Sequence, residues 1–423
     1  MDTMDNDPYL SPLANELEKK TTTSTKIIEK CDAILKELSN PIINMDKIKK
    51  ACFTGIPDDL NGLRSLLWKL LLGYLPPERE KWDSVLKQNR KNYDDFVFDY
   101  VKSKALKINP QKKNGSEKKD SSTGKEESKL NNSTTSTTTT SKKAVITLDA
   151  SSMEDHPLST SKNSEWNTFF KDRELWDEID KDTRRTRREI SLFSQSTNNE
   201  LLYTLSKQAK KDEVERHHDV LTRILFIYAK LNPGVRYVQG MNELLAPIYY
   251  CFYNDENPLF KGFAEADSFY CFTTIMSEAK ENFVKSLDNT DTGIKARIAN
   301  LNNMLRKVDQ ILWEHLRMQN VNPQFYSLRW LMLMLTQEFL LVDVLRLWDS
   351  FLCVPDRHEF INYCCLALLL CSKENIMGQD FPVIMQVLQK NTSIDMEVLL
   401  RKTVSLYKTY GNAAHLSQFT LSI

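Results

Sequence analysis

Two short segments of this chain carry side chains suited to chemistry on an oxyanion. The segment IDKDTRR, at residues 179–185, ends in Arg185, whose planar guanidinium is always charged and offers five N–H donors. The segment YVQGMNELLAP, at residues 237–247, contains Gln239, an uncharged amide that can both donate and accept hydrogen bonds. We follow Arg185 and Gln239 as candidate catalytic residues, and neither side chain would need a cofactor of its own.

The spacing around Arg185 predicts one helical face. Asp182 precedes Arg185 by three residues and Ile179 precedes Asp182 by three, so we expect Ile179 to anchor this face in the core. Arg184 then points elsewhere. An alternative stays open, in which this is a surface helix with an incidental ion pair of little energy and four arginines, at 184, 185, 187 and 188.

The spacing around Gln239 predicts the start of a helix. Asn232-Pro233-Gly234 breaks the chain just before it, and Gly240 permits close approach of a partner. The alternative is that Gln239 caps the helix by satisfying buried amides. The residues around Gln239 leave both interpretations open.

The elements that must position these residues are helical by their apolar spacing. Ile294, Ile298, Leu301, Leu305, Val308 and Leu312 recur every three or four residues, which predicts one buried helix face. Similar patterns predict helices at 27–38, 63–75, 214–229, 264–283, 342–354, 359–372 and 396–410. The only candidate strand is 145–148. The chain is therefore predicted to be all-α.

A third segment, at residues 55–79, has the pattern of ordinary helical architecture. Its sequence is GIPDDLNGLRSLLWKLLLGYLPPER, in which Gly55-Ile56-Pro57 predicts a turn. Asp58 or Asp59 is expected to cap the helix that follows. The buried face of that helix is predicted to consist of Leu63, Leu66, Leu67, Trp68, Leu70 and Leu71.

Composition and missing motifs narrow the function. The 423 residues carry 57 basic and 57 acidic side chains, which removes any global electrostatic argument for nucleic-acid binding. The N-terminus lacks the pattern of a secretory signal, and the longest apolar run, residues 363–371, is far shorter than the ~20 residues that cross a bilayer. We therefore expect a soluble intracellular protein.

The common metal and nucleotide motifs are also missing. The chain has no GxxxxGK[ST] loop, so we do not expect it to hydrolyse GTP itself. His217 and His218, at the polar start of a predicted helix, are expected to face solvent. The eight cysteines include no CxxC pair and are expected to be reduced thiols in the core.

Residues 103–143 break the globular pattern. They are mostly Lys, Ser, Thr, Asn and Gly, with almost no large apolar side chains to offset the entropy of ordering. We therefore predict a disordered insertion. Lysines at 112, 113, 118 and 119 could contact an acidic membrane, but nearby acidic residues favour a solvated linker.

Taken together and in this order, the three segments resemble the TBC domain of Rab GTPase-activating proteins. The GIP…LR…W…LLG pattern is matched at residues 55–73, IxxDxxR at 179–185, and YxQGMN at 237–242. The later motif is matched by Trp330, Asp343, Arg346, Trp348 and Asp349. Residues 155–172, DHPLSTSKNSEWNTFFKD, are similar to one family member in particular.

The resemblance implies a TBC-domain helical fold of two helical halves with the insertion between segments. The implied boundaries are an N-terminal segment at 1–41 with a probable helix, the TBC domain at 42–410 and a tail at 411–423. One departure from the family is visible. Many members read RTxP after the arginine, whereas Arg188 occupies the proline position here.

The resemblance also implies a function. Arg185 would act as an arginine finger and Gln239 as a glutamine finger, both supplied in trans to a Rab-family GTPase during GTP hydrolysis. The implied supporting residues are Ile179, Asp182, Tyr237, Gly240, Met241 and Asn242. Asp182 would hold the Arg185 guanidinium in the free protein, and Tyr237 with Asn242 would shape the loop around Gln239.

The partner implied by the resemblance is a GTP-bound Rab that carries GTP and Mg²⁺, so the protein would need no cofactor of its own. No nucleic acid is implied, and membrane contact would occur only through the partner. We expect a cytoplasmic protein that visits intracellular membranes transiently and regulates vesicle trafficking. Two alternatives are a catalytically silent Rab-binding scaffold with the same fold, and an unrelated helical interaction module.

Overall fold

The computed structural model describes residues 7–20, 24–103, 165–200, 205, 214–283, 293–389, 394–412, 416 and 419. Their regular secondary structure is almost entirely helical, which confirms the predicted all-α class. Residues 104–143 of the predicted insertion and the strand predicted at 145–148 lie outside the described residues.

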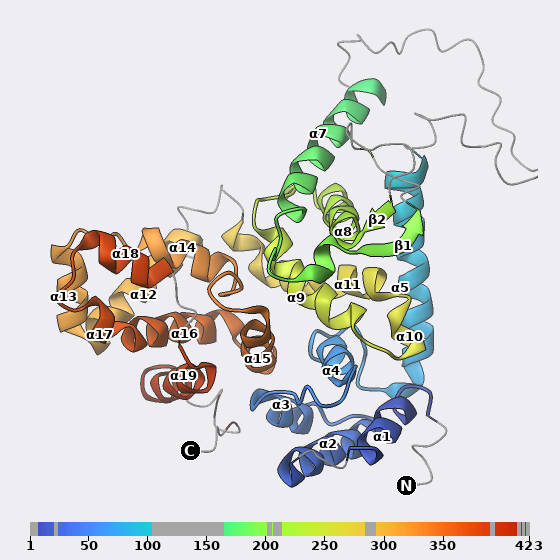
Figure 1. The fold of residues 1–423 in the computed structure, drawn as a ribbon, viewed down its shortest axis with the longest axis horizontal. Coiled ribbons are helices and arrows are strands. Elements are labelled where there is room, and N and C mark those ends of the chain that lie inside the picture. Colours follow the sequence, from blue (N-terminus) through green and yellow to red (C-terminus); the bar gives the residue numbers. More distant parts are fainter. Residues whose placement is uncertain are drawn as a thin grey trace, which may run out of the picture.

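The described residues up to 283 form one lobe, on the right in Figure 1. Helix α5 runs along its edge, and α8, α9 and α11 pack together in its interior. The elements of this lobe are α1 (Ser11–Glu18), α2 (Thr25–Leu38), α3 (Met45–Phe53), α4 (Leu63–Leu71), η1 (Arg79–Lys81), α5 (Trp82–Val97), η2 (Phe98–Lys102), α7 (Glu165–Thr183), η4 (Ser191–Ser194), β1 (Ser196–Glu200), β2 (Val214–Arg216), α8 (His217–Leu231), α9 (Met241–Tyr253), α10 (Pro258–Lys261), α11 (Ala264–Ala279) and η5 (Lys280–Asn282).

The described residues from 293 onward form the second lobe, with α15 on the side that faces the first lobe (Figure 1). Its elements are α12 (Ile294–Val308), α13 (Gln310–Met318), α14 (Gln324–Met332), α15 (Leu341–Phe351), α16 (Arg357–Cys371), α17 (Lys373–Ile376), α18 (Phe381–Gln389) and α19 (Met396–Tyr410). Helices α16 and α19 pack side by side.

Most predicted helices are present, but several differ from their predicted bounds, and the helix predicted at 63–75 ends at Leu71. The pattern at 294–312 is divided between α12 and α13, because Asp309 leaves helical geometry and its side chain accepts a hydrogen bond from the Leu312 N–H at 2.9 Å. Residues 214–216 pair with β1 as an antiparallel strand. Neither strand has the alternating apolar pattern that would have predicted it.

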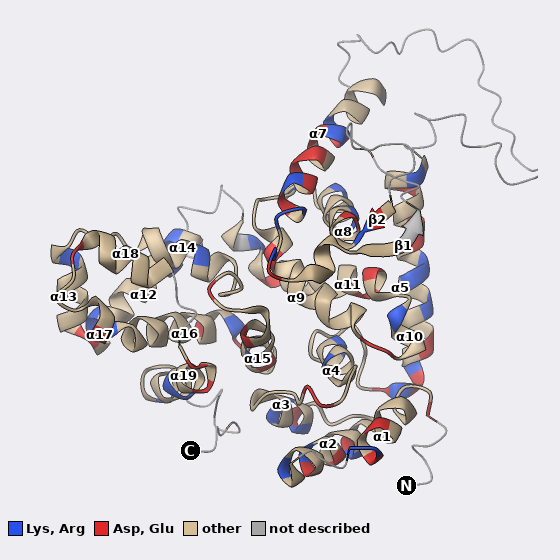
Figure 2. Ribbon diagram, in the orientation of Figure 1, with Lys and Arg blue, Asp and Glu red and all other residues tan. Residues whose placement is uncertain are grey.

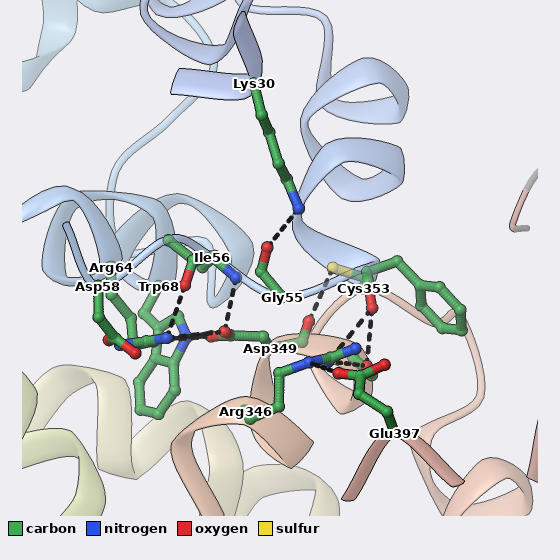
Figure 3. A network of polar contacts seen from close by, with 12 residues as sticks. Lys30, Gly55, Ile56, Asp58, Arg64, Trp68, Arg346, Asp349, Cys353 and Glu397 are labelled. Carbon is green, nitrogen blue, oxygen red and sulfur yellow. Dashed lines mark hydrogen bonds and ion pairs between the residues drawn. The ribbon is translucent and has the colours of Figure 1, made fainter. Parts of the chain in front are cut away.

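A buried carboxylate joins the two lobes. Asp349, in α15, accepts hydrogen bonds from the Ile56 N–H at 2.8 Å, the Trp68 indole N–H at 2.8 Å and the Arg64 Nε at 3.1 Å (Figure 3). The first and last family motifs therefore meet in space. Asp58 does not cap α4 as predicted but contacts Arg64, and Gly62 takes the N-cap position.

The charged residues, the lengths of the apolar helices and the cysteines bear on the predictions made from composition. Acidic and basic residues are interspersed over both lobes, and the segment that follows α7 is mostly basic (Figure 2). None of the described helices is long and apolar enough to cross a membrane. All eight cysteines are free, and six are buried, whereas Cys251 and Cys371 are half-buried.

Candidate functional site

Arg185 lies in the turn that follows α7, with its side chain exposed. Its backbone N–H donates to the Asp182 carbonyl at 3.0 Å, and its Nε donates to the Lys181 carbonyl at 2.9 Å. The predicted helical face shared with Asp182 is therefore wrong, and no ion pair joins these two described side chains. The helix ends at Thr183, whose hydroxyl is 2.7 Å from that of Thr222 in α8.

The anchoring of the same helix in the core is confirmed. Ile179, one turn before the end of α7, is fully buried. Trp176, one turn earlier, is also buried and stacks edge-on against Phe226 of α8, with ring centroids 5.1 Å apart. The core therefore fixes the direction in which α7 delivers the turn that carries Arg185.

Gln239 lies immediately before α9, with its side chain exposed. The helix begins at Met241, as predicted, and Met241 itself is fully buried. Gly240 is the N-cap residue and has a φ of 103°, a backbone conformation that favours glycine. A Cβ atom at this position would lie 2.8 Å from Leu333 Cδ2, so the close approach that Gly240 permits is by a residue of the same chain.

Two hydrogen bonds connect the turn after α7 to the segment around Gln239. The Tyr237 hydroxyl donates to Asp182 Oδ2 at 2.8 Å, and Asn242 Nδ2 donates to Thr186 Oγ1 at 2.8 Å. Burial, together with the Asp182 carboxylate, raises the pKa of Tyr237, so this phenol stays a neutral donor. Asp182 thus orients Tyr237, and the two segments are held in one arrangement.

Arg185 and Gln239 line the same cavity, which has a volume of about 360 Å³. Asp182, Gly240, Asn242 and Glu243 also line it. The opposite wall comes from α14 and the turn after it, through Leu328, Arg329, Met332, Leu333 and Gln337. The structure therefore brings the two candidate catalytic residues together on an open surface, with a cation and an amide facing one space.

The turn after α14 was not predicted to contribute to the site. Met334 and Leu335 have φ values of 50° and 62°, which are uncommon for residues other than glycine. The Arg329 guanidinium closes this turn by donating two hydrogen bonds to the Glu338 carboxylate, from Nε at 2.6 Å and from Nη2 at 2.8 Å. The Trp348 indole N–H also donates to the Met334 carbonyl at 3.3 Å. Trp348 belongs to the later motif, but its contact with this turn and that of Arg329 with Glu338 depend on the folded chain.

The prediction that His217 and His218 face solvent is wrong, because both are buried. His217 Nδ1 lies 2.7 Å from the Tyr249 hydroxyl, and burial lowers the pKa of His217 to about 4. Ligand atoms of Asp180, His218 and Asp219 lie within 4.8 Å of one another. Each of the two carboxylates already accepts a hydrogen bond, Asp180 from the Arg184 Nε at the end of α7 and Asp219 from the Arg216 N–H at the start of α8.

Comparisons of the sequence with known proteins point to one family. The model of the Rab-GTPase-TBC domain family matches residues 148–377. Human TBC1 domain family member 13 is 36% identical over 87% of this chain and 95% of its own length. The fission yeast GTPase-activating protein gyp1 is 23% identical over 97% of this chain and 68% of its own length.

A solved structure shows the same fold. The crystal structure of the Ypt/Rab-GAP domain of Gyp1p superposes with a TM-score of 0.62 and 20% identity, over 90% of this chain and 97% of that one. The three motifs occur in family order, and the two helical lobes have the fold of that domain. The chain therefore belongs to the Rab-GTPase-TBC domain family.

Proposed function

We propose that this protein accelerates GTP hydrolysis by a Rab-family small GTPase, to which it supplies Arg185 and Gln239 in trans. One observation carries the proposal. Both side chains are exposed and line one cavity, on two segments joined by the Tyr237–Asp182 and Asn242–Thr186 hydrogen bonds. Membership of the Rab-GTPase-TBC family supports a Rab as the partner.

The proposed roles follow from the chemistry of phosphoryl transfer. The reaction builds charge on the transferred phosphoryl group and requires a positioned water, so catalysis consists mainly of placement and electrostatic stabilisation. The Arg185 guanidinium would neutralise the developing charge, and the Gln239 amide would orient the attacking water. GTP and Mg²⁺ would come with the partner.

The contacts that Arg185 makes in the absence of a partner suit this role. Its Nε donates to the Lys181 carbonyl, while no carboxylate in the described structure holds the guanidinium. Releasing one exposed hydrogen bond costs only about 0.5–1.5 kcal/mol, so the side chain can extend toward a partner at little cost. Lysine at this position should be a poor substitute, because it lacks the planar fork of donors.

The protein is expected to bind the GTP-bound, membrane-attached form of its partner transiently, from the cytoplasm, and so to regulate vesicle trafficking. A catalytically silent scaffold with the same fold is the alternative function. The presence of both an arginine and an amide in one open cavity favours the catalyst.

The proposal is tested with purified Rab GTPases loaded with GTP. Hydrolysis is measured with the wild-type protein and with Arg185→Ala, Arg185→Lys and Gln239→Ala. We expect acceleration of one or a few Rabs, reduced by about 10³-fold or more in Arg185→Ala. GTP-dependent binding without acceleration of any Rab would contradict the proposal and support the scaffold.

A further inference from the structure

We propose that Arg187 is a positioning residue that fixes the turn carrying Arg185 relative to the helix that begins after Gln239. The proposal rests on the proposed function and adds a residue that takes no part in the chemistry. Arg187 belongs to the run of arginines at 184–188, yet only 6% of its surface is exposed, whereas Arg184, Arg185 and Arg188 are exposed.

The backbone at Arg187 needs support. Its φ of 43° lies in the left-handed region, where a residue other than glycine is held at a cost of about 1–3 kcal/mol. Such a conformation persists only where surrounding contacts determine it. The next position is Arg188, so a proline ring does not restrict the turn here.

The Arg187 side chain supplies the missing support through three segments. Its Nη1 donates to the Phe339 carbonyl at 3.0 Å, and its Nη2 donates to the Thr336 carbonyl. Its Nε lies 3.3 Å from Glu243 Oε2 in the first turn of α9. One buried guanidinium therefore connects the turn of Arg185, the turn after α14 and the helix that follows Gln239.

This set of contacts explains how two candidate catalytic residues on separate segments keep one relative position. The turn after α14 is itself fixed by Arg329 and Glu338, and its first residue, Leu333, packs against Gly240. Arg187 bonds to two carbonyls of the same turn. Both candidate segments therefore contact the turn after α14, and Arg187 makes this contact on the Arg185 side.

Position 187 requires the planar guanidinium group of arginine. Lysine would keep a cation beside Glu243 but could not donate in fixed directions to two carbonyls. Glycine would remove the backbone strain at a positive φ and would also remove the side-chain contacts. The Arg187→Gly variant therefore separates a requirement for the backbone shape from a requirement for the guanidinium.

The first test compares Arg187→Ala, Arg187→Gly and Arg187→Lys in GTPase activation. Misplacement of a catalytic group by about 1 Å can cost 10²-fold, so we expect kcat to fall about 10- to 100-fold in the Ala and Gly variants with KM for the GTPase unchanged. The kcat of Arg187→Lys should lie between that of the wild type and that of Arg187→Ala. Arg188→Ala removes the same charge from the same turn without removing a buried contact, and should leave kcat unchanged.

The second test needs no GTPase, so it distinguishes failure of this inference from failure of the proposed function. Hydrogen exchange is followed at the amides of Arg185, Thr186 and Ile190, which are hydrogen-bonded within the turn. Exchange should rise at least 10-fold in Arg187→Ala and Arg187→Gly and stay unchanged in Arg188→Ala, with all variants showing wild-type exchange in α16.

Two results would overturn the inference. One is unchanged exchange of the turn amides in Arg187→Ala. The other is an Arg187→Gly protein with wild-type kcat and exchange, which would show that only the backbone shape matters. If Arg187→Ala and Arg187→Gly do not fold, Arg187→Lys is compared with Arg188→Ala instead. Equal kcat and equal exchange of the turn amides in these two proteins would also reject the positioning role of Arg187.

Discussion

At the scale of single residues, Gly240 shows how one missing side chain shapes the site. Its positive φ and the contact with Leu333 both disfavour a Cβ atom. Gly378 provides a matched control, because it also has a positive φ, of 76°, but nothing lies within 4 Å of the Cβ position.

We predict that Gly240→Ala and Gly378→Ala both lower the free energy of unfolding, by about 1–2 kcal/mol, through backbone strain. Only Gly240→Ala should also reduce GTPase activation, because Leu333 must shift next to Gln239. Urea denaturation and hydrolysis rates measure the two effects. Equal activity in the two variants would argue against a precise placement of Gln239 by this contact.

His217 gives a prediction for pH. Burial lowers the pKa of the folded imidazole from 6.5 to about 4. Between these values the unfolded state binds a proton that the folded state does not, so the free energy of unfolding falls as pH drops below about 6.5. At pH 5 the expected loss from this group is about 1–2 kcal/mol.

The control for this effect is His217→Phe, followed by urea denaturation at pH 7 and pH 5. The variant should be less stable at pH 7, because the hydrogen bond to Tyr249 is lost, but it should lose less stability on acidification. His358, whose pKa burial also lowers, contributes equally to both proteins. An unchanged pH dependence would show that His217 is not the group that titrates.

At the scale of elements, Asp349 joins α15 to the segment before α4 and to α4 itself (Figure 3). We predict that Asp349→Ala costs about 3–5 kcal/mol, because Arg64 is left as a buried charge without its main partner. Glu397→Ala removes an exposed partner of Arg346 in the same region and should cost about 0–1 kcal/mol. Chemical denaturation measures both, and a similar small loss in the two variants would contradict this role of Asp349.

The elements also show what the sequence could reveal. Apolar spacing predicted the bounds of α19 and most of α2, because a helix that packs on one side repeats its core contacts locally. The end of α7 could not be predicted, since Thr183 contacts Thr222 and Asn242 contacts Thr186 from distant segments. The run of four arginines gave no sign that one of them is buried.

The candidate catalytic pair was predictable for a different reason. Arg185 and Gln239 were identified from their side-chain chemistry and from family motifs, and the structure places both at one cavity. Their supports were only partly identified. Tyr237 and Asn242 belong to the motif, whereas Arg187, Arg329 and Leu333 act through contacts that depend on the folded chain.

At the scale of the whole molecule, the segment matched by the family model lacks residues that contact it in the folded chain. Residues 148–377 exclude Ile56, Arg64 and Trp68, which bond to Asp349, and they exclude α19, which packs on α16. We predict that this fragment lacks a cooperative thermal transition, whereas the full chain unfolds cooperatively. A fragment with the melting temperature of the full chain would contradict this dependence between the lobes.

The measurement that tests the central claim most directly uses a Rab partner whose own water-positioning glutamine is replaced by alanine. Single-turnover GTP hydrolysis is followed with the wild-type protein, Arg185→Ala and Gln239→Ala. If the protein supplies both groups in trans, the wild type will accelerate the altered Rab nearly as well as the unaltered one. Arg185→Ala will then lose about 10³-fold or more and Gln239→Ala about 10²-fold or more. Loss of acceleration on replacing the Rab glutamine, with full activity retained by Gln239→Ala, would contradict the account.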